Sequence, residues 1–113
     1  MDVNPLAARR CQALEGQAAL TATQVAECLA QAPGWSVEQG AIEKRFEFTD
    51  YHRTLAFVNA LAWVAHTEDH HPDLRVSCGR CTVRFCTHSV GGISINDFIC
   101  AAKVDALAGQ SLP

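Results

Sequence analysis

Three histidines stand in two short segments where the sequence pattern predicts the ends of regular elements. His70 and His71 are adjacent and precede Pro72, whereas His88 follows an alternating apolar segment. Imidazole titrates at about pH 6.5, so at neutral pH it can both accept and donate a proton. Asp97 follows a few residues later, and a carboxylate of this kind can hold one imidazole in a fixed tautomer. These side chains predict general acid/base catalysis in a cleft.

The same residues allow two other interpretations. A carboxylate near the start of a helix interacts favourably with free backbone amides, and the spacing of Asp97 by itself favours this capping role over catalysis. A zinc or iron ion could also be held by the three histidines together with Asp97. However, the H-T-E-D-H run at 66–70 has its acid in the wrong position for the zinc motif H-E-x-x-H. The C-x-x-C at 78–81 has no second such pair, whereas a zinc ribbon needs four ligands. We therefore rank a metal-dependent enzyme lower, and expect His66 to be a pocket wall.

Apolar periodicity and turn residues divide the chain into helix, hairpin, helix, hairpin and helix. Thr21 and Gln24 form the T-x-x-Q capping pattern of a first helix, which Pro33-Gly34 ends. The later predicted elements are strands 35–37 and 42–48, a helix over about 51–68 capped by Thr49 or Asp50, strands 74–78 and 81–87, and a helix that begins at Ser94 and ends at Gly109. This order predicts an α+β fold, in which three helices pack on one face of a single four-stranded antiparallel sheet made of two hairpins, α-β-β-α-β-β-α.

Two segments depart from these regular patterns. Residues 1–19 show no sustained periodicity and contain Pro5 and Gly16, so we expect a flexible tail before a domain over 20–113. Lys44 interrupts the apolar face of the strand over 42–48, which predicts that this end of the strand is exposed.

Composition narrows the functional class. The 113 residues are enough for one domain, and 49% hydrophobic against 19% charged residues supports a core rather than disorder. The net charge of −3, with no basic cluster beyond Arg9-Arg10, argues against a nucleic-acid partner. No apolar run is long enough to span a membrane, and the first residues lack the apolar region of a secretory signal. We therefore expect the six cysteines to be reduced thiols in the cytoplasm.

Several motifs occur together in the order of one known family. They are Glu68-Asp69-His70-His71-Pro72-Asp73, Thr87-His88 and Asp97, with Pro33-Gly34-Trp35, Phe46-Glu47-Phe48 and Asn96-Asp97-Phe98 outside the proposed site. In residue type and spacing this set resembles the signature of the pterin-4a-carbinolamine dehydratases. The resemblance extends over residues 20–108, and so long an ordered pattern is far more specific than His-His-Pro alone.

The resemblance implies a lyase, 4a-hydroxytetrahydrobiopterin dehydratase, which removes water from 4a-hydroxytetrahydropterin to give quinonoid dihydropterin. This reaction recycles the pterin used by aromatic amino-acid hydroxylases and needs no metal or redox cofactor. By resemblance, His70, His71 and His88 form the acid/base set, and Asp97 orients or charge-stabilises one imidazole. The residues implied in substrate binding are His70, His71, Pro72, Thr87, His88, Ser89 and Val90.

The resemblance also bears on partners. Members of this family are commonly dimers or tetramers, so a homodimer or homotetramer is expected. Some members also bind a transcription factor and promote its dimerisation. The alternative function is therefore that of a non-enzymatic, coactivator-like binding protein. We rank it second, because a pure binding module would not need all three histidines together with Asp97.

Overall fold

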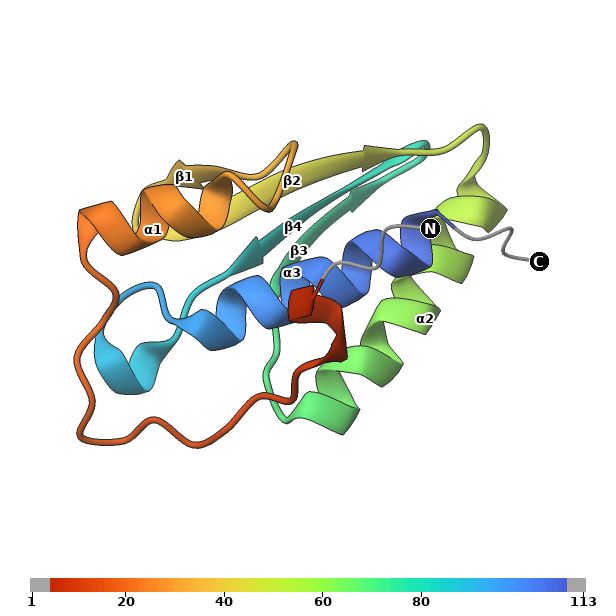
Figure 1. Cartoon of the computed structure of the whole chain (residues 1–113). Helices are drawn as coiled ribbons and strands as arrows, with labels where there is room; N and C mark the ends of the chain where they lie inside the picture. Colours follow the sequence, from red (N-terminus) through yellow and green to blue (C-terminus); the bar gives the residue numbers. More distant parts are fainter. Residues whose placement is uncertain (1–4, 110–113) are drawn as a thin grey trace.

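The computed structural model describes residues 5–109 and contains one antiparallel sheet with helices on one of its faces (Figure 1). Its elements are the 3₁₀ helix η1 (Pro5–Ala8), α1 (Ala22–Leu29), β1 (Ser36–Glu38), β2 (Ala41–Glu47), α2 (Tyr51–Glu68), β3 (Asp73–Ser77), β4 (Arg80–Phe85), the 3₁₀ helix η2 (His88–Val90) and α3 (Ile95–Ala108). The strand order is β1-β2-β4-β3, and every neighbouring pair is antiparallel. The predicted α+β fold is confirmed. No helix in the described part of the chain is long and apolar enough to cross a membrane.

Each main helix begins at a side chain that satisfies free backbone amides. Thr21 and Gln24 form a complete capping box at the start of α1, as the sequence predicts. Asp50 caps α2 by accepting a hydrogen bond of 2.8 Å from the amide of Arg53. Ser94 caps α3 in a second complete capping box, and Asp97 is its third helical residue. These short-range bonds fix where the helices start relative to the strands.

The core lies between the sheet and the helices α2 and α3. Val83 and Phe85 of β4 and Phe57 of α2 are at most 1% exposed. The rings of Phe46 and Phe57 meet with centroids 4.8 Å apart, which joins β2 to α2. A fully buried side chain of this size contributes roughly 1.5–3 kcal/mol to stability. This packing holds the ends of α2, β4 and α3 in fixed relative positions.

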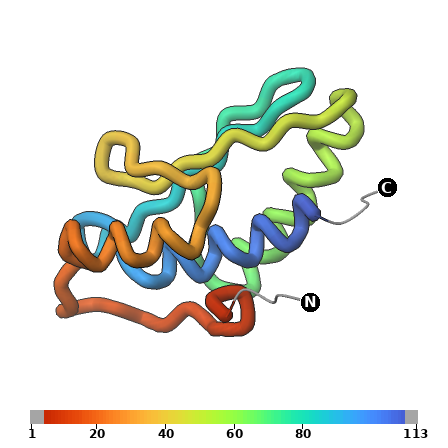
Figure 2. Tube along the Cα trace, turned by 45° about the horizontal axis from the view of Figure 1, so that its top comes forward, coloured from red at the N-terminus to blue at the C-terminus, as the bar shows by residue number. Residues whose placement is uncertain are grey.

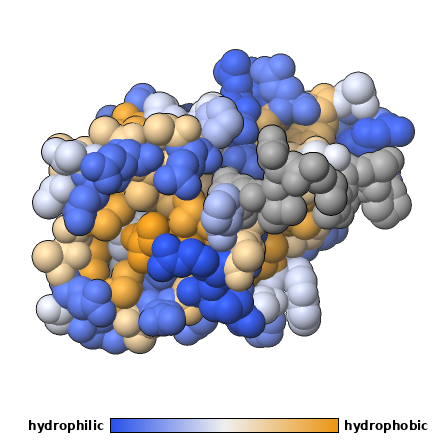
Figure 3. All heavy atoms as spheres, viewed as in Figure 1, coloured by the Kyte–Doolittle hydropathy of each residue, from blue (hydrophilic) through white to orange (hydrophobic). Residues whose placement is uncertain are grey.

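Helix α1 packs more loosely than α2 and α3. None of its residues is buried. An open hollow of about 400 Å³ lies beside it, with a lining that includes Leu20, Val25 and Ile93. Figure 3 shows the apolar side chains gathered between α1 and the start of α3. The side chain that bonds the His70 ring comes instead from α3.

Lys44 does not lie at an exposed strand end, so that prediction is wrong. Its Nζ lies 2.8 Å from Oδ1 of Asp105 on α3, and its side chain is 24% exposed. The indole nitrogen of Trp35 donates a hydrogen bond of 2.9 Å to the other oxygen of the same carboxylate. Asp105 supplies the partner that allows a lysine on the covered face of β2.

Residues 5–15 lie along the domain, and we call them the strap. Leu6 is buried, and the Nζ atom of Lys103 on α3 donates a hydrogen bond of 2.8 Å to the carbonyl of Ala7. Further along, Arg10 forms an ion pair of 2.9 Å with Glu68 at the end of α2. Figure 2 shows this segment running beside α3 and the end of α2. The partners of the strap lie on distant helices, so its sequence shows no local periodicity; that residues 1–19 are a flexible tail stays a prediction. Residues 1–4 of that prediction lie outside the described residues.

All six cysteines have free thiols. Cys81 and Cys100 are fully buried, and burial raises the pKa of Cys81. The contact with the Cys11 thiol, together with burial, raises the pKa of Cys100. A raised pKa disfavours the thiolate, which is the reactive form.

We expect protein purified without reductant to contain no obligatory disulfide. Intact mass and thiol titration should find reduced cysteines, and added reductant should leave the urea midpoint unchanged. The first pair to inspect is Cys11 and Cys100, whose Sγ atoms lie 3.5 Å apart. Loss of roughly 2–4 kcal/mol of stability on reduction, the usual contribution of a structural disulfide, would contradict this prediction.

Candidate active site

His70 is positioned by the way α2 ends. Asp69 adopts the left-handed conformation with φ of 51°, and the amide of His70 donates a hydrogen bond of 3.1 Å to the carbonyl of Ala65. Pro72 then prevents any further helix, because it has no amide hydrogen. The imidazole of His70 stacks on Phe85 with centroids 5.8 Å apart and planes 9° from parallel. The ring is 13% exposed and lies against the sheet.

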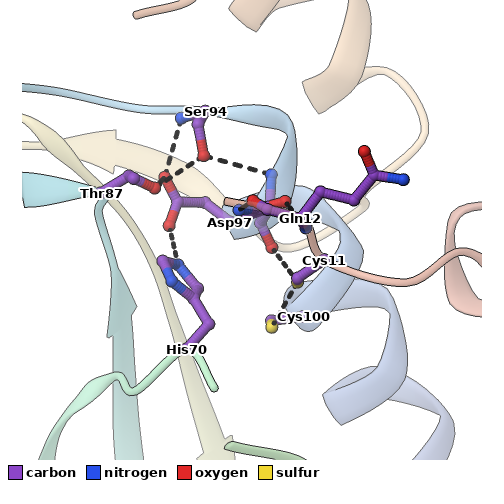
Figure 4. A network of polar contacts seen from close by, with 8 residues as sticks. Cys11, Gln12, His70, Thr87, Ser94, Asp97 and Cys100 are labelled. Carbon is purple, nitrogen blue, oxygen red and sulfur yellow. Dashed lines mark hydrogen bonds and ion pairs between the residues drawn. The ribbon is translucent and has the colours of Figure 1, made fainter. Parts of the chain in front are cut away.

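Asp97 connects this histidine to the start of α3 (Figure 4). Its Oδ1 atom lies 2.6 Å from Nε2 of His70, and the carboxylate is fully buried. Its Oδ2 atom accepts hydrogen bonds from the amide of Ser94 at 2.8 Å and from the hydroxyl of Thr87 at 3.0 Å. Asp97 therefore makes both contacts that the sequence allowed, one to the helix start and one to an imidazole.

The ring orientation of His70 has a chemical consequence. A neutral imidazole that donates its Nε2 hydrogen to a carboxylate keeps Nδ1 as an acceptor. The same carboxylate stabilises the positive imidazolium after that nitrogen takes a proton. The pair of His70 with Asp97 is thus suited to general base catalysis.

The other two histidines lie at the surface. The side chain of His71 is exposed, and so is that of His88, the first residue of η2. Neither makes a side-chain hydrogen bond within the described residues 5–109. Backbone hydrogen bonds between Thr87 and Gly92, of 2.8 and 3.3 Å, close the loop that carries His88. The structure therefore holds the His70 ring between Asp97 and Phe85, whereas the His71 and His88 rings are exposed.

His66 lies elsewhere, so its expected place in the pocket wall is wrong. Its ring meets that of Trp63 with centroids 5.7 Å apart on the exposed side of α2. The helix ends at Glu68, and the left-handed residue Asp69 then turns the chain. His66 and His70 therefore do not share a helical face, although they are four residues apart.

A cavity of about 270 Å³ lies beside His70. Its lining residues are Cys11, Gln12, Ala13, Leu14, Glu15, Glu68, Asp69, His70, Thr87, Ser89 and Asn96. A second hollow of about 270 Å³ is lined by Gly40, Cys86, Thr87, His88, Gly91 and Gly92. Thr87 lines both, so the two hollows lie next to each other at this residue. Within residues 5–109, no group of three or more His, Cys, Asp or Glu side chains has the arrangement of a metal site.

Sequence reasoning did not identify strap residues 11–15 or Asn96 as part of this site. No periodicity marks the strap, and Asn96 resembles an ordinary first-turn helix residue. Gly16, which belongs to the predicted flexible tail, adopts a positive φ of 81° in a turn next to this site.

Comparison with known proteins gives the family. The sequence model of the family described as pterin 4 alpha carbinolamine dehydratase matches residues 18–107. The chain belongs to the pterin-4a-carbinolamine dehydratase family. A provisionally named pterin-4-alpha-carbinolamine dehydratase of Stenotrophomonas maltophilia is 54% identical over 112 residues, which cover 96% of this chain and 97% of that protein. A protein of Bdellovibrio bacteriovorus with the same provisional name is 57% identical over 96 residues, or 81% of this chain and 80% of its own.

Two solved structures of pterin dehydratase type are similar to this one. A structure described as a transcriptional coactivator/pterin dehydratase from Brucella melitensis has a TM-score of 0.78 and 32% identity, covering 80% of this chain and 99% of its own. A pterin dehydratase-like protein described as a RuBisCO assembly factor in the alpha-carboxysome has a TM-score of 0.56 and 29% identity, covering 68% and 89%. Both the family and the fold implied by the sequence motifs are therefore confirmed.

Proposed function

We propose that the protein is a 4a-hydroxytetrahydrobiopterin dehydratase of the cytoplasm. The observation that carries this proposal is the buried Asp97 carboxylate 2.6 Å from Nε2 of His70, beside a cavity within a fold of the dehydratase family. The proposed substrate-binding segments, 70–72 and 87–90, lie at the ends of α2 and β4. An aromatic amino-acid hydroxylase would supply the substrate.

The proposed reaction moves two protons and breaks one bond. The C4a–O bond breaks, and the hydroxyl leaves as water after it receives a proton from a general acid. A general base removes the proton from the adjacent ring nitrogen, and a C=N double bond forms. His70 is the proposed base, because Asp97 stabilises its protonated form. His71 and His88 complete the proposed acid/base set, and their exposed imidazoles can approach a bound pterin.

We expect the protein to accelerate dehydration of freshly generated 4a-hydroxytetrahydropterin without added metal. The measurement is the rate of product formation with the uncatalysed rate subtracted, before and after treatment with a chelator. Because His70 and Asp97 can transfer the proton themselves, chelation should leave the rate unchanged. If a chelator abolished activity and one metal restored it, a metal-dependent reaction would replace this proposal.

Protein association is a second proposed property, favoured by exposed apolar side chains. On the exposed surface of α2, Trp63 is 69% exposed and Leu55 is 36% exposed. On the edge strand β3, Leu74 is 37% exposed and Val76 is 38% exposed. We propose that this apolar face joins copies of the chain in a homodimer or homotetramer.

We expect light scattering to give the mass of a dimer or a tetramer. Trp63→Glu and Leu74→Glu should shift it towards the monomer, because each places a charge on the apolar face. Val37→Glu is the matched control, since Val37 is 43% exposed on β1, at the other edge of the sheet. A monomeric wild-type protein would contradict self-association. In that case the apolar face would instead bind a different protein, as the coactivator-like function requires.

A further inference from the structure

The strap has a defined shape next to the cavity. The amide of Gln17 donates a hydrogen bond of 3.0 Å to the carbonyl of Leu14, which closes a turn around Glu15 and Gly16. Gly16 adopts a φ of 81°, where a side chain would be strained. The turn therefore holds Glu15 at the border of the cavity that it lines.

Two anchors hold the strap to the elements that carry the catalytic pair. The side-chain oxygen of Asn96 accepts a hydrogen bond of 3.2 Å from the amide of Gln12, and its nitrogen donates one of 2.7 Å to the carbonyl of Gln12. Glu68 accepts a hydrogen bond of 2.8 Å from the amide of Cys11. Asn96 precedes Asp97, and Glu68 ends α2 two residues before His70.

The anchor at Glu68 is a charged one. Burial opposes its ionisation, but the amide of Cys11 and the charges of Lys103 and Arg10 outweigh this and lower the pKa of Glu68. Its two oxygens are thus occupied by strap and helix groups. The carboxylate of Glu15, by contrast, has no hydrogen bond or ion pair with any described residue and is exposed at the cavity.

The strap lies before the part of the chain that the family's sequence model matches. That match begins at residue 18, and the Brucella melitensis structure covers 80% of this chain. The cavity wall formed by residues 11–15 is therefore an addition to the region of the family model, although it lies within the stretch shared with the Stenotrophomonas maltophilia relative, which covers 96% of this chain.

We propose that strap residues 11–15 form a substrate-binding wall, in which the Glu15 carboxylate accepts hydrogen bonds from the aminopyrimidinone edge of the pterin. This inference rests on the proposed function, because it takes a pterin as the ligand of the cavity. That edge presents two neighbouring N–H donors, one on the amino group and one on the ring. A carboxylate has two oxygens at matching spacing, and hydrogen bonds to a charged acceptor are the stronger kind.

The test measures binding separately from catalysis. The probe is 7,8-dihydrobiopterin, which has the same aminopyrimidinone edge as the substrate but no hydroxyl on C4a to lose. We expect Glu15→Gln to raise the Kd for this probe, and the KM for the carbinolamine, by about tenfold, with kcat within about twofold. Glu27→Gln, the same change at an exposed carboxylate on α1, should change neither constant.

Two further variants separate the strap from its neighbours. Asn96→Ala removes both hydrogen bonds to Gln12, so it should raise the Kd and speed hydrogen exchange at residues 11–15. Asp69→Asn changes the other exposed carboxylate of the cavity, in a residue type that tolerates its left-handed conformation. An effect on Kd at Asp69 and none at Glu15 would overturn the proposal.

The outcomes distinguish this inference from the proposed function. Wild-type activity with an unchanged Kd in Glu15→Gln would refute the strap wall alone. Probe binding without dehydration would refute the dehydratase activity. The ratio of the Kd values of Glu15→Gln and wild type for 7,8-dihydrobiopterin would still show whether Glu15 binds the pterin. A wild-type protein that neither binds 7,8-dihydrobiopterin nor dehydrates the carbinolamine would refute both.

Discussion

Replacing His70, His71 or His88 by alanine should lower the rate of carbinolamine dehydration by roughly 10²–10⁴-fold, the usual contribution of a positioned proton donor or acceptor. Single-turnover rates measured beside urea midpoints separate this loss from unfolding. The exposed His71 and His88 should change stability little. His70→Ala leaves one oxygen of the buried Asp97 without its partner, which should cost roughly 1–3 kcal/mol.

His52→Ala is the matched control for this series. His52 is exposed on the first turn of α2, and it lines neither of the two hollows beside the candidate site. Its variant should keep the full rate. Near-normal rates in all three of the other histidine variants would refute the proposed acid/base mechanism and favour the binding function.

Changes at Asp97 should separate its two contacts. Asp97→Asn retains a hydrogen-bonding group at the start of α3 but no longer stabilises a positive imidazole. We therefore expect a smaller loss of rate than in the histidine variants, with the fold retained. Asp97→Ala also leaves the amide of Ser94 and the hydroxyl of Thr87 without their acceptor. Because both are buried, this variant should lose roughly 1–3 kcal/mol of stability as well.

The measurements for Asp97 are the rate and the free energy of unfolding for both variants. Glu43→Gln provides a comparison, because Glu43 pairs with Arg84 at 2.9 Å on the sheet, and both side chains are partly exposed. An ion pair of this kind contributes about 0–1 kcal/mol. If Asp97→Asn kept the full rate while Asp97→Ala lost only stability, Asp97 would be a helix cap and not a catalytic partner.

The sequence by itself determined the secondary structure and the family. Helix starts at Thr21 and Ser94 follow from side chains that bond amides three residues away or nearer, so the signal is contained in one turn. The hairpins follow from alternation, which depends only on neighbouring positions. Pro72 marks the end of α2 through its own geometry. These are local effects, and a single segment shows them.

Only the tertiary structure decided which distant groups meet. His70 and Asp97 are 27 residues apart, and they pair because α2 ends beside the start of α3. Lys44 pairs with Asp105, which is 61 residues away in the sequence. This pairing covers a lysine that its strand pattern predicts to be exposed. In the strap, Cys11 bonds Glu68, 57 residues away, and Gln12 bonds Asn96, 84 residues away. Such contacts depend on how the elements pack around the core, so they leave no periodic pattern in the sequence. For the same reason, the four-residue spacing between His66 and His70 wrongly predicted that His66 lines the pocket.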